Sequence, residues 1–133
     1  MRRLFFIFAT TIALSPVPAE AAWEKFYTQD NGAILYIEMS GIHQVSNSPK
    51  IWSRIDLKQV RGSELREVIT LQRFDCDAQT AARLSMTTIN LNGKVTKSNI
   101  PESLATEDYI IPGSVEWLVS VFACAEYNAS KEN

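Results

Sequence analysis

Hydrophobic and polar residues alternate with a period of two along much of the chain after residue 22. The clearest case is Lys50–Lys58, where one side carries Ile51, Ser53, Ile55 and Leu57 and the other side is mostly charged. This period predicts a β-strand with one buried and one solvated face. Similar segments separated by turn residues predict about six strands in all: Trp23–Gln29, Ile34–Glu38, Lys50–Lys58, Leu65–Cys76, Thr80–Leu91 and Lys94–Ser98.

The fourth of these segments is long, and its alternation slips in the middle. Ile69 and Leu71 have the opposite parity from Val68 and Phe74. A β-bulge inserts one residue and moves the following side chains to the other face of a strand. We therefore expect a bulge between the two halves of this segment.

The pattern changes to a helical period near the C-terminus. Ser114 is a favourable N-cap, and an i, i+3, i+4, i+7 stripe follows it. The stripe consists of Val115, Leu118, Val119 and Phe122, and Trp117, Val121 and Ala125 widen it. Only Glu116 and Ser120 remain for the solvated side, so the sheet or a partner must cover this helix.

These elements predict an α+β fold, with an antiparallel sheet of about six strands and one C-terminal helix packed on it. The breadth of the apolar stripe leaves a homodimer contact as an additional expectation. The last residues, 127–133, are mostly polar and are expected to form a disordered tail.

Residues 1–21 have the three parts of a secretion signal. Arg2 and Arg3 are followed by the apolar run Leu4–Leu14, and Ala19-Glu20-Ala21 forms an A-x-A cleavage site. The run is too short to span a bilayer of ~30 Å, and no cysteine lies beside the cleavage site to accept a lipid. We expect a signal peptide at 1–21, one domain at 22–126 and no stable membrane anchor.

Charge argues against nucleic acid as a partner. The chain has 13 Lys and Arg against 15 Asp and Glu, a formal net charge of −2. Removing Arg2, Arg3 and Glu20 makes the mature protein slightly more negative. Binding to phosphates generally requires a clear basic excess.

Cys76 and Cys124 are the two cysteines of the chain. A redox pair usually has the C-x-x-C spacing, and a metal site needs further ligands of matching type. Since export leads to an oxidising compartment, a structural disulfide between the predicted fourth strand and the helix is the favoured interpretation.

No catalytic, cofactor or metal motif is evident. His43 is the single histidine, and a hydrolase triad built on it lacks the G-x-S-x-G elbow. Glu107 and Asp108 resemble half of a carboxylate pair, but neighbouring residues usually point apart, so we interpret them as part of a solvated loop.

One row of side chains is a candidate for binding a partner. Lys50, Arg54 and Lys58 recur every four residues, so in a strand they share one face with Trp52 between them. A cationic strip with an aromatic residue suits an acidic glycan or an acidic patch of an extracellular protein. The alternative is an ordinary solvated strand face, which the acidic Asp56 in the same row favours.

Several short segments resemble one family when they are taken together: Tyr36-Ile37-Glu38 with Gly41-Ile42, Phe74-Asp75-Cys76, Leu84-Ser85-Met86 with Asn92-Gly93-Lys94-Val95, and Pro112-Gly113-Ser114 with Cys124. In this order they resemble the surface-adhesin protein E family of small exported bacterial proteins. The resemblance extends from Trp23 to Cys124.

This resemblance implies an antiparallel sheet with a C-terminal helix joined to it by a Cys76–Cys124 disulfide. It also implies a non-enzymatic adhesin without a cofactor that binds extracellular-matrix components or other acidic extracellular partners. A displayed adhesin must be retained at the surface, and this chain has no lipid-acceptor cysteine at its predicted N-terminus. A periplasmic ligand-binding or envelope-structural protein of a Gram-negative bacterium, sharing the fold, is therefore the alternative.

We predict cleavage between Ala21 and Ala22 on export, because the A-x-A site directly follows the apolar run. Intact-mass measurement of the exported protein should give a chain that begins at Ala22. A mature N-terminus that retains Arg2 and Arg3 would contradict the prediction.

Overall fold

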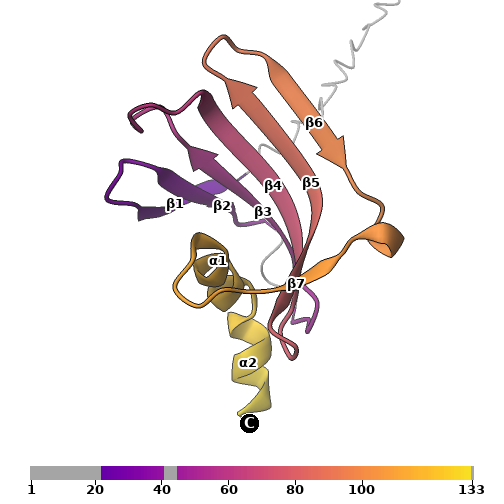
Figure 1. The fold of residues 1–133 in the computed structure, drawn as a ribbon. Helices are drawn as coiled ribbons and strands as arrows, with labels where there is room; N and C mark the ends of the chain where they lie inside the picture. The colour runs from indigo at the N-terminus through magenta and orange to yellow at the C-terminus, as the bar shows by residue number, and fades with distance from the viewer. Residues whose placement is uncertain (1–21, 41–44, 133) are drawn as a thin grey trace, which may run out of the picture.

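The computed structural model describes residues 22–40 and 45–132. Seven strands form one antiparallel sheet, with two helices near the C-terminus (Figure 1). The elements are β1 (Trp23–Thr28), β2 (Ile34–Glu38), β3 (Lys50–Asp56), β4 (Leu65–Asp75), β5 (Thr80–Asn90), β6 (Val95–Asn99), the 3₁₀-helix η1 (Glu102–Leu104), β7 (Glu107–Tyr109), α1 (Val115–Ala123) and α2 (Ala125–Lys131). The predicted fold class is confirmed.

The strands follow one another across the sheet in the order β1-β2-β3-β4-β5-β6. β7 also pairs with β5, through Ala82↔Glu107, while β6 pairs with the other half of β5 from Ser85 onward. Sequence reasoning interpreted residues around β7 as a polar loop. A three-residue edge strand with all of its residues exposed has no hydrophobic alternation by which it could be recognised.

The bulge that was expected within β4 is not found there, because β4 carries no extra residue between Glu67 and Asp75. The register with β5 shifts between Leu71 and Gln72, which lie opposite Ser85 and Arg83. The extra residue is Leu84, so the bulge belongs to β5 rather than to β4. The pairing of β3 with β4 runs without a shift, and the bulge changes which side chains of β5 face the helix.

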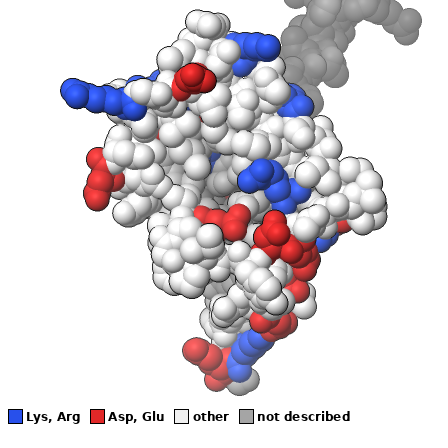
Figure 2. All heavy atoms as spheres, in the orientation of Figure 1, with Lys and Arg blue, Asp and Glu red and all other residues white. Residues whose placement is uncertain are grey.

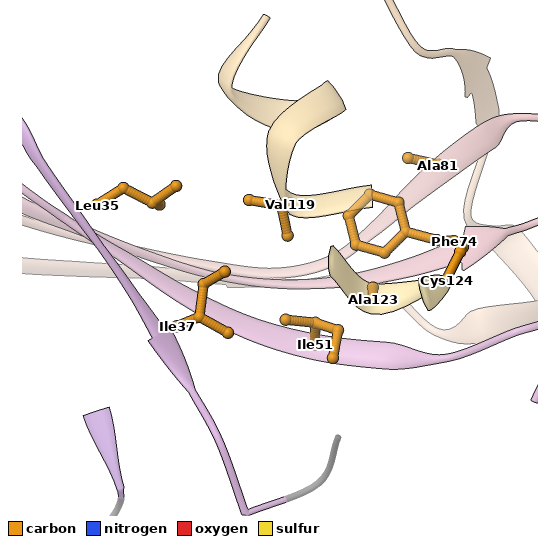
Figure 3. Close-up of a cluster of buried hydrophobic side chains, with 8 residues drawn as sticks. All are labelled: Leu35, Ile37, Ile51, Phe74, Ala81, Val119, Ala123 and Cys124. Atoms are coloured by element: carbon orange, nitrogen blue, oxygen red, sulfur yellow. The ribbon is translucent and has the colours of Figure 1, made fainter. Parts of the chain in front are cut away.

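The hydrophobic core lies between α1 and one face of the sheet (Figure 3). Its fully buried members include Phe74 and Ile37 from the sheet and Val119 from α1. Around them pack Leu35, Ile51, Ala81, Ala123 and Cys124. The alternation predicted for β3 is confirmed, since Ile51 and Ser53 are buried on this side and Trp52 is exposed on the other.

α1 begins where the sequence indicates, but its polar and apolar sides are arranged differently from the prediction. The Ser114 hydroxyl accepts a hydrogen bond from the Trp117 amide at 3.1 Å, which confirms the N-cap. Glu116 was assigned to the solvated side, yet it accepts a hydrogen bond from the buried Gln72 side chain at 2.6 Å. Trp117 and Val121 are exposed instead, because the narrow α1 covers the sheet with only part of its circumference.

The expected disordered tail is helical in the structure. α2 extends to Lys131, and its side chains reach the turn between β4 and β5. The Tyr127 hydroxyl donates to Asp77 at 2.9 Å, and Lys131 forms an ion pair with the same carboxylate. The hydrogen bond from Lys131 lowers the pKa of Asp77, and Tyr127 lowers it further. One exposed acid therefore anchors two residues spaced one helical turn apart.

Cys76 and Cys124 form the predicted disulfide, with Cα atoms 5.7 Å apart. It joins the end of β4 to the junction of α1 and α2. The bridge closes a long loop, which in the chain-entropy model stabilises a fold by roughly 4 kcal/mol. None of the described helices is long and apolar enough to cross a membrane.

Val119 and Val121 provide a matched test of this packing, because they are the same residue type on the same helix. Val119 is 2% exposed and Val121 is 50% exposed. Val119→Ala should lower the free energy of unfolding by about 2–3 kcal/mol, since it removes two buried methyl groups and leaves a cavity. Val121→Ala should change it by less than about 0.5 kcal/mol. Urea unfolding measures both, and equal losses would show that α1 is packed differently.

Candidate interaction surface

The sheet face opposite α1 is covered by no described helix. The alternating side chains of β1, β2, β3 and β4 that point away from the core form this open face, which we define by six residues: Trp23, Tyr36, Trp52, Arg54, Ile69 and Leu71. Cross-strand pairing places Arg54 between Tyr36 and Ile69, and Trp52 beside Leu71. Trp52 is 39% exposed in the middle of its strand, so the open face presents a large aromatic group to solvent.

Arg54 contacts two aromatic rings and lies near a carboxylate on the open face. Its guanidinium carbon lies 4.4 Å from the centre of the Tyr36 ring and 5.3 Å from the Trp23 ring. Its Nε atom lies 3.6 Å from a carboxylate oxygen of Glu67 and makes no hydrogen bond within the described part of the chain. Cation–π contacts at partly exposed sites contribute ~0.5–2 kcal/mol each, so the two rings hold Arg54 in one orientation.

The predicted cationic strip is only partly assembled by the structure. Lys50, Trp52 and Arg54 share the outward face of β3, as expected. Lys58 lies two residues beyond the end of the strand and forms an ion pair with Asp56 at 3.4 Å. The strip is also charge-balanced, because Lys50 pairs with Glu102 and Arg54 lies near Glu67.

Glu102 was missed by sequence reasoning, although it determines the charge at one end of the strip. It lies in η1, where it bridges Lys50 and Arg73, with 3.3 Å to the latter. The hydrogen bond from Lys50 is the main cause that lowers the pKa of Glu102. The carboxylate therefore remains ionised at neutral pH. No local pattern in the sequence could reveal this long-range contact.

The structure does not bring the remaining candidate residues together into one site. His43 lies outside the described residues. Glu107 and Asp108 are neighbours on β7 and point to opposite faces of the sheet, since Glu107 contacts Arg73 at 3.2 Å on the open side while Asp108 lines a cavity on the helix side. Among residues 22–40 and 45–132, no three His, Cys, Asp or Glu side chains lie close enough together to hold a metal ion.

These features define a small disulfide-bonded α+β domain in which one sheet face carries the helices and the other is open. A family model for surface-adhesin protein E matches residues 23–125, and the chain belongs to this family. The family resemblance seen in the sequence is thereby confirmed.

One solved structure shows a similar fold. Crystal form II of Haemophilus influenzae protein E is 13% identical, with a TM-score of 0.53 and coverage of 85% of this chain and 94% of that chain. Protein E from non-typeable Haemophilus influenzae is 12% identical, with a TM-score of 0.48 and coverage of 86% and 83%. No curated protein matches the sequence.

Proposed function

We propose that this protein is an exported, non-enzymatic adhesin that binds an extracellular protein or an acidic glycan through the open face of its sheet. The single observation that carries the proposal is Trp52, which is 39% exposed beside the fixed Arg54 guanidinium. Tryptophan, tyrosine and arginine are the residues most enriched at the energetic centres of protein interfaces. Family membership supports a role in adhesion.

The rigidity of Arg54 favours binding. Ordering a flexible side chain on association costs ~0.5–1.5 kcal/mol. Because Tyr36 and Trp23 already hold Arg54 in place, this cost is met when the protein folds. A partner would find an aromatic ring and a positioned cation side by side.

The ion pairs of Lys50 and Lys58 are compatible with an acidic partner. Both lysine side chains are about half exposed, at 48% and 59%. Exposed ion pairs contribute only ~0–1 kcal/mol, so an incoming carboxylate or sulfate can replace Glu102 or Asp56 at small cost. Binding of this kind weakens as salt rises.

The perturbed ionisable groups support a non-enzymatic role. Glu38, Asp77 and Glu102 have lowered pKa values, which arise mainly from hydrogen bonds to Ser40, Lys131 and Lys50, respectively. All three carboxyls lie at the surface, in turns or ion pairs. Catalytic groups are more often found where burial and a converging set of polar side chains shift the pKa.

Trp52 and Trp117 provide a matched test, because both are 39% exposed and they lie on opposite sides of the sheet. The purified mature protein is assayed by surface plasmon resonance against immobilised matrix proteins and heparin. Trp52→Ala should weaken binding by at least about tenfold, as expected for an interface hot spot, and Trp117→Ala should leave it unchanged. Lys50→Glu/Lys58→Glu should reduce binding most at low salt.

Arg54 is left intact in these variants because its removal would disturb the packing of Trp23 and Tyr36. Circular dichroism verifies that each variant is folded. Equal binding by the parent and Trp52→Ala would contradict the assignment of the open face. A parent protein that binds no matrix component, and is retained between the membranes on cell fractionation, would contradict the adhesin role itself.

A further inference from the structure

A second candidate site lies on the helix side of the sheet, separated from the open face by the sheet itself. It is a cavity of about 260 Å³ between β4 and β5, the connection from β6 to β7, and the first turn of α1. Its lining consists of Gln72, Arg83, Asp108 and Glu116, with Ala81, Ile100, Leu104 and Thr106 completing the walls. Figure 2 shows basic and acidic side chains close together on this face.

The pairing of β5 explains why the cavity exists. β7 pairs with β5 as far as Ala82, and β6 pairs with it only from Ser85 onward. Between these points the chain leaves the edge of β5 through η1. Arg83 lies in this gap, opposite Gln72 and next to the Leu84 bulge, on the side of the sheet that α1 covers. Bulges frequently redirect side chains at functional sites.

Of the three charged groups of the cavity, Glu116 links α1 to the sheet through its hydrogen bond with Gln72. No ion pair within the described part of the chain involves Arg83, Asp108 or Glu116. Gln72 is 8% exposed and donates to Glu116 at 2.6 Å, which fixes one carboxylate at the cavity wall. Arg83 and Asp108 are exposed toward solvent. The cavity therefore offers one guanidinium and two carboxylates to an incoming molecule.

This set of charges discriminates among ligand classes. A purely anionic molecule would meet repulsion from Asp108 and Glu116, and a purely cationic one would meet repulsion from Arg83. A zwitterion satisfies both, because a guanidinium binds a carboxylate in bidentate fashion and an ammonium group donates to carboxylates. The cavity volume of about 260 Å³ lies just below the range of about 300–1,000 Å³ that is common for ligand sites. The ligand must therefore be a small molecule.

We propose that this cavity binds a small zwitterion, either a free amino acid or a short peptide. Arg83 would receive the carboxylate of the ligand, and Asp108 and Glu116 its ammonium group. Ile100 and Leu104 would contact an apolar side chain. The site would give the protein a ligand-binding activity that is independent of adhesion.

Isothermal titration calorimetry of the mature protein tests the proposal, with the twenty free amino acids and glycylglycine as probes. At least one probe should bind with a stoichiometry of one. Arg83→Gln and Asp108→Asn should each weaken that binding by at least about tenfold, since each removes a charge-assisted hydrogen bond. Acetate and methylammonium, which each carry one of the two charges, should bind more weakly than the best zwitterion.

The matched controls are Lys97→Gln and Asp30→Asn, which remove an exposed charge of the same sign elsewhere on the protein. Both should bind the zwitterion as the parent does. Absence of heat with every probe, or equal affinity in the parent and Arg83→Gln, would overturn the proposal. Because the cavity and the open face share no residue, Trp52→Ala should leave zwitterion binding unchanged, and each proposal can fail without the other.

Discussion

The packing of α1 on one face of the sheet is the constraint on which the rest of the structure depends. Val119 is buried against the core that contains Phe74, and the Cys76–Cys124 disulfide holds the end of the helix to the end of β4. A sheet of this size has two faces, and a nine-residue helix can cover only part of one. Both candidate binding sites, the open face and the cavity, lie where this helix leaves the sheet uncovered.

No described helix packs on the open face, so its side chains must be stabilised by contacts with one another. There, Arg54 contacts the rings of Trp23 and Tyr36 and lies near the Glu67 carboxylate. These contacts pack polar and aromatic groups together although the described helices leave this face uncovered. On the helix side of the sheet, the first turn of α1 brings Glu116 to Gln72 and forms one wall of the cavity. The two candidate sites are thus consequences of the same one-sided packing.

The elements with regular alternation could be predicted from the sequence, and those fixed by distant contacts could not. The bounds of β2 and the cap at Ser114 follow from local chemistry, and the cysteine pairing from export and cysteine number. β7 is short and exposed, and α2 depends on Asp77, a residue far away in the sequence. The placement of Trp52 and Arg54 on one face of the strand could be predicted from their spacing. That Glu67 lies near Arg54 and Glu102 pairs with Lys50 could not, because these contacts depend on the register of the sheet and on the path of η1.

Hydrogen exchange of the oxidised protein and of a Cys76→Ser/Cys124→Ser variant tests the central claim most directly. If the disulfide and the core together hold α1 on the sheet, the variant should lose ~2–5 kcal/mol of unfolding free energy. The amides of α1 should then lose protection before those of β3, β4 and β5, because the central strands open last. Unchanged protection of α1 in the folded variant, with an unchanged free energy of unfolding, would contradict the account.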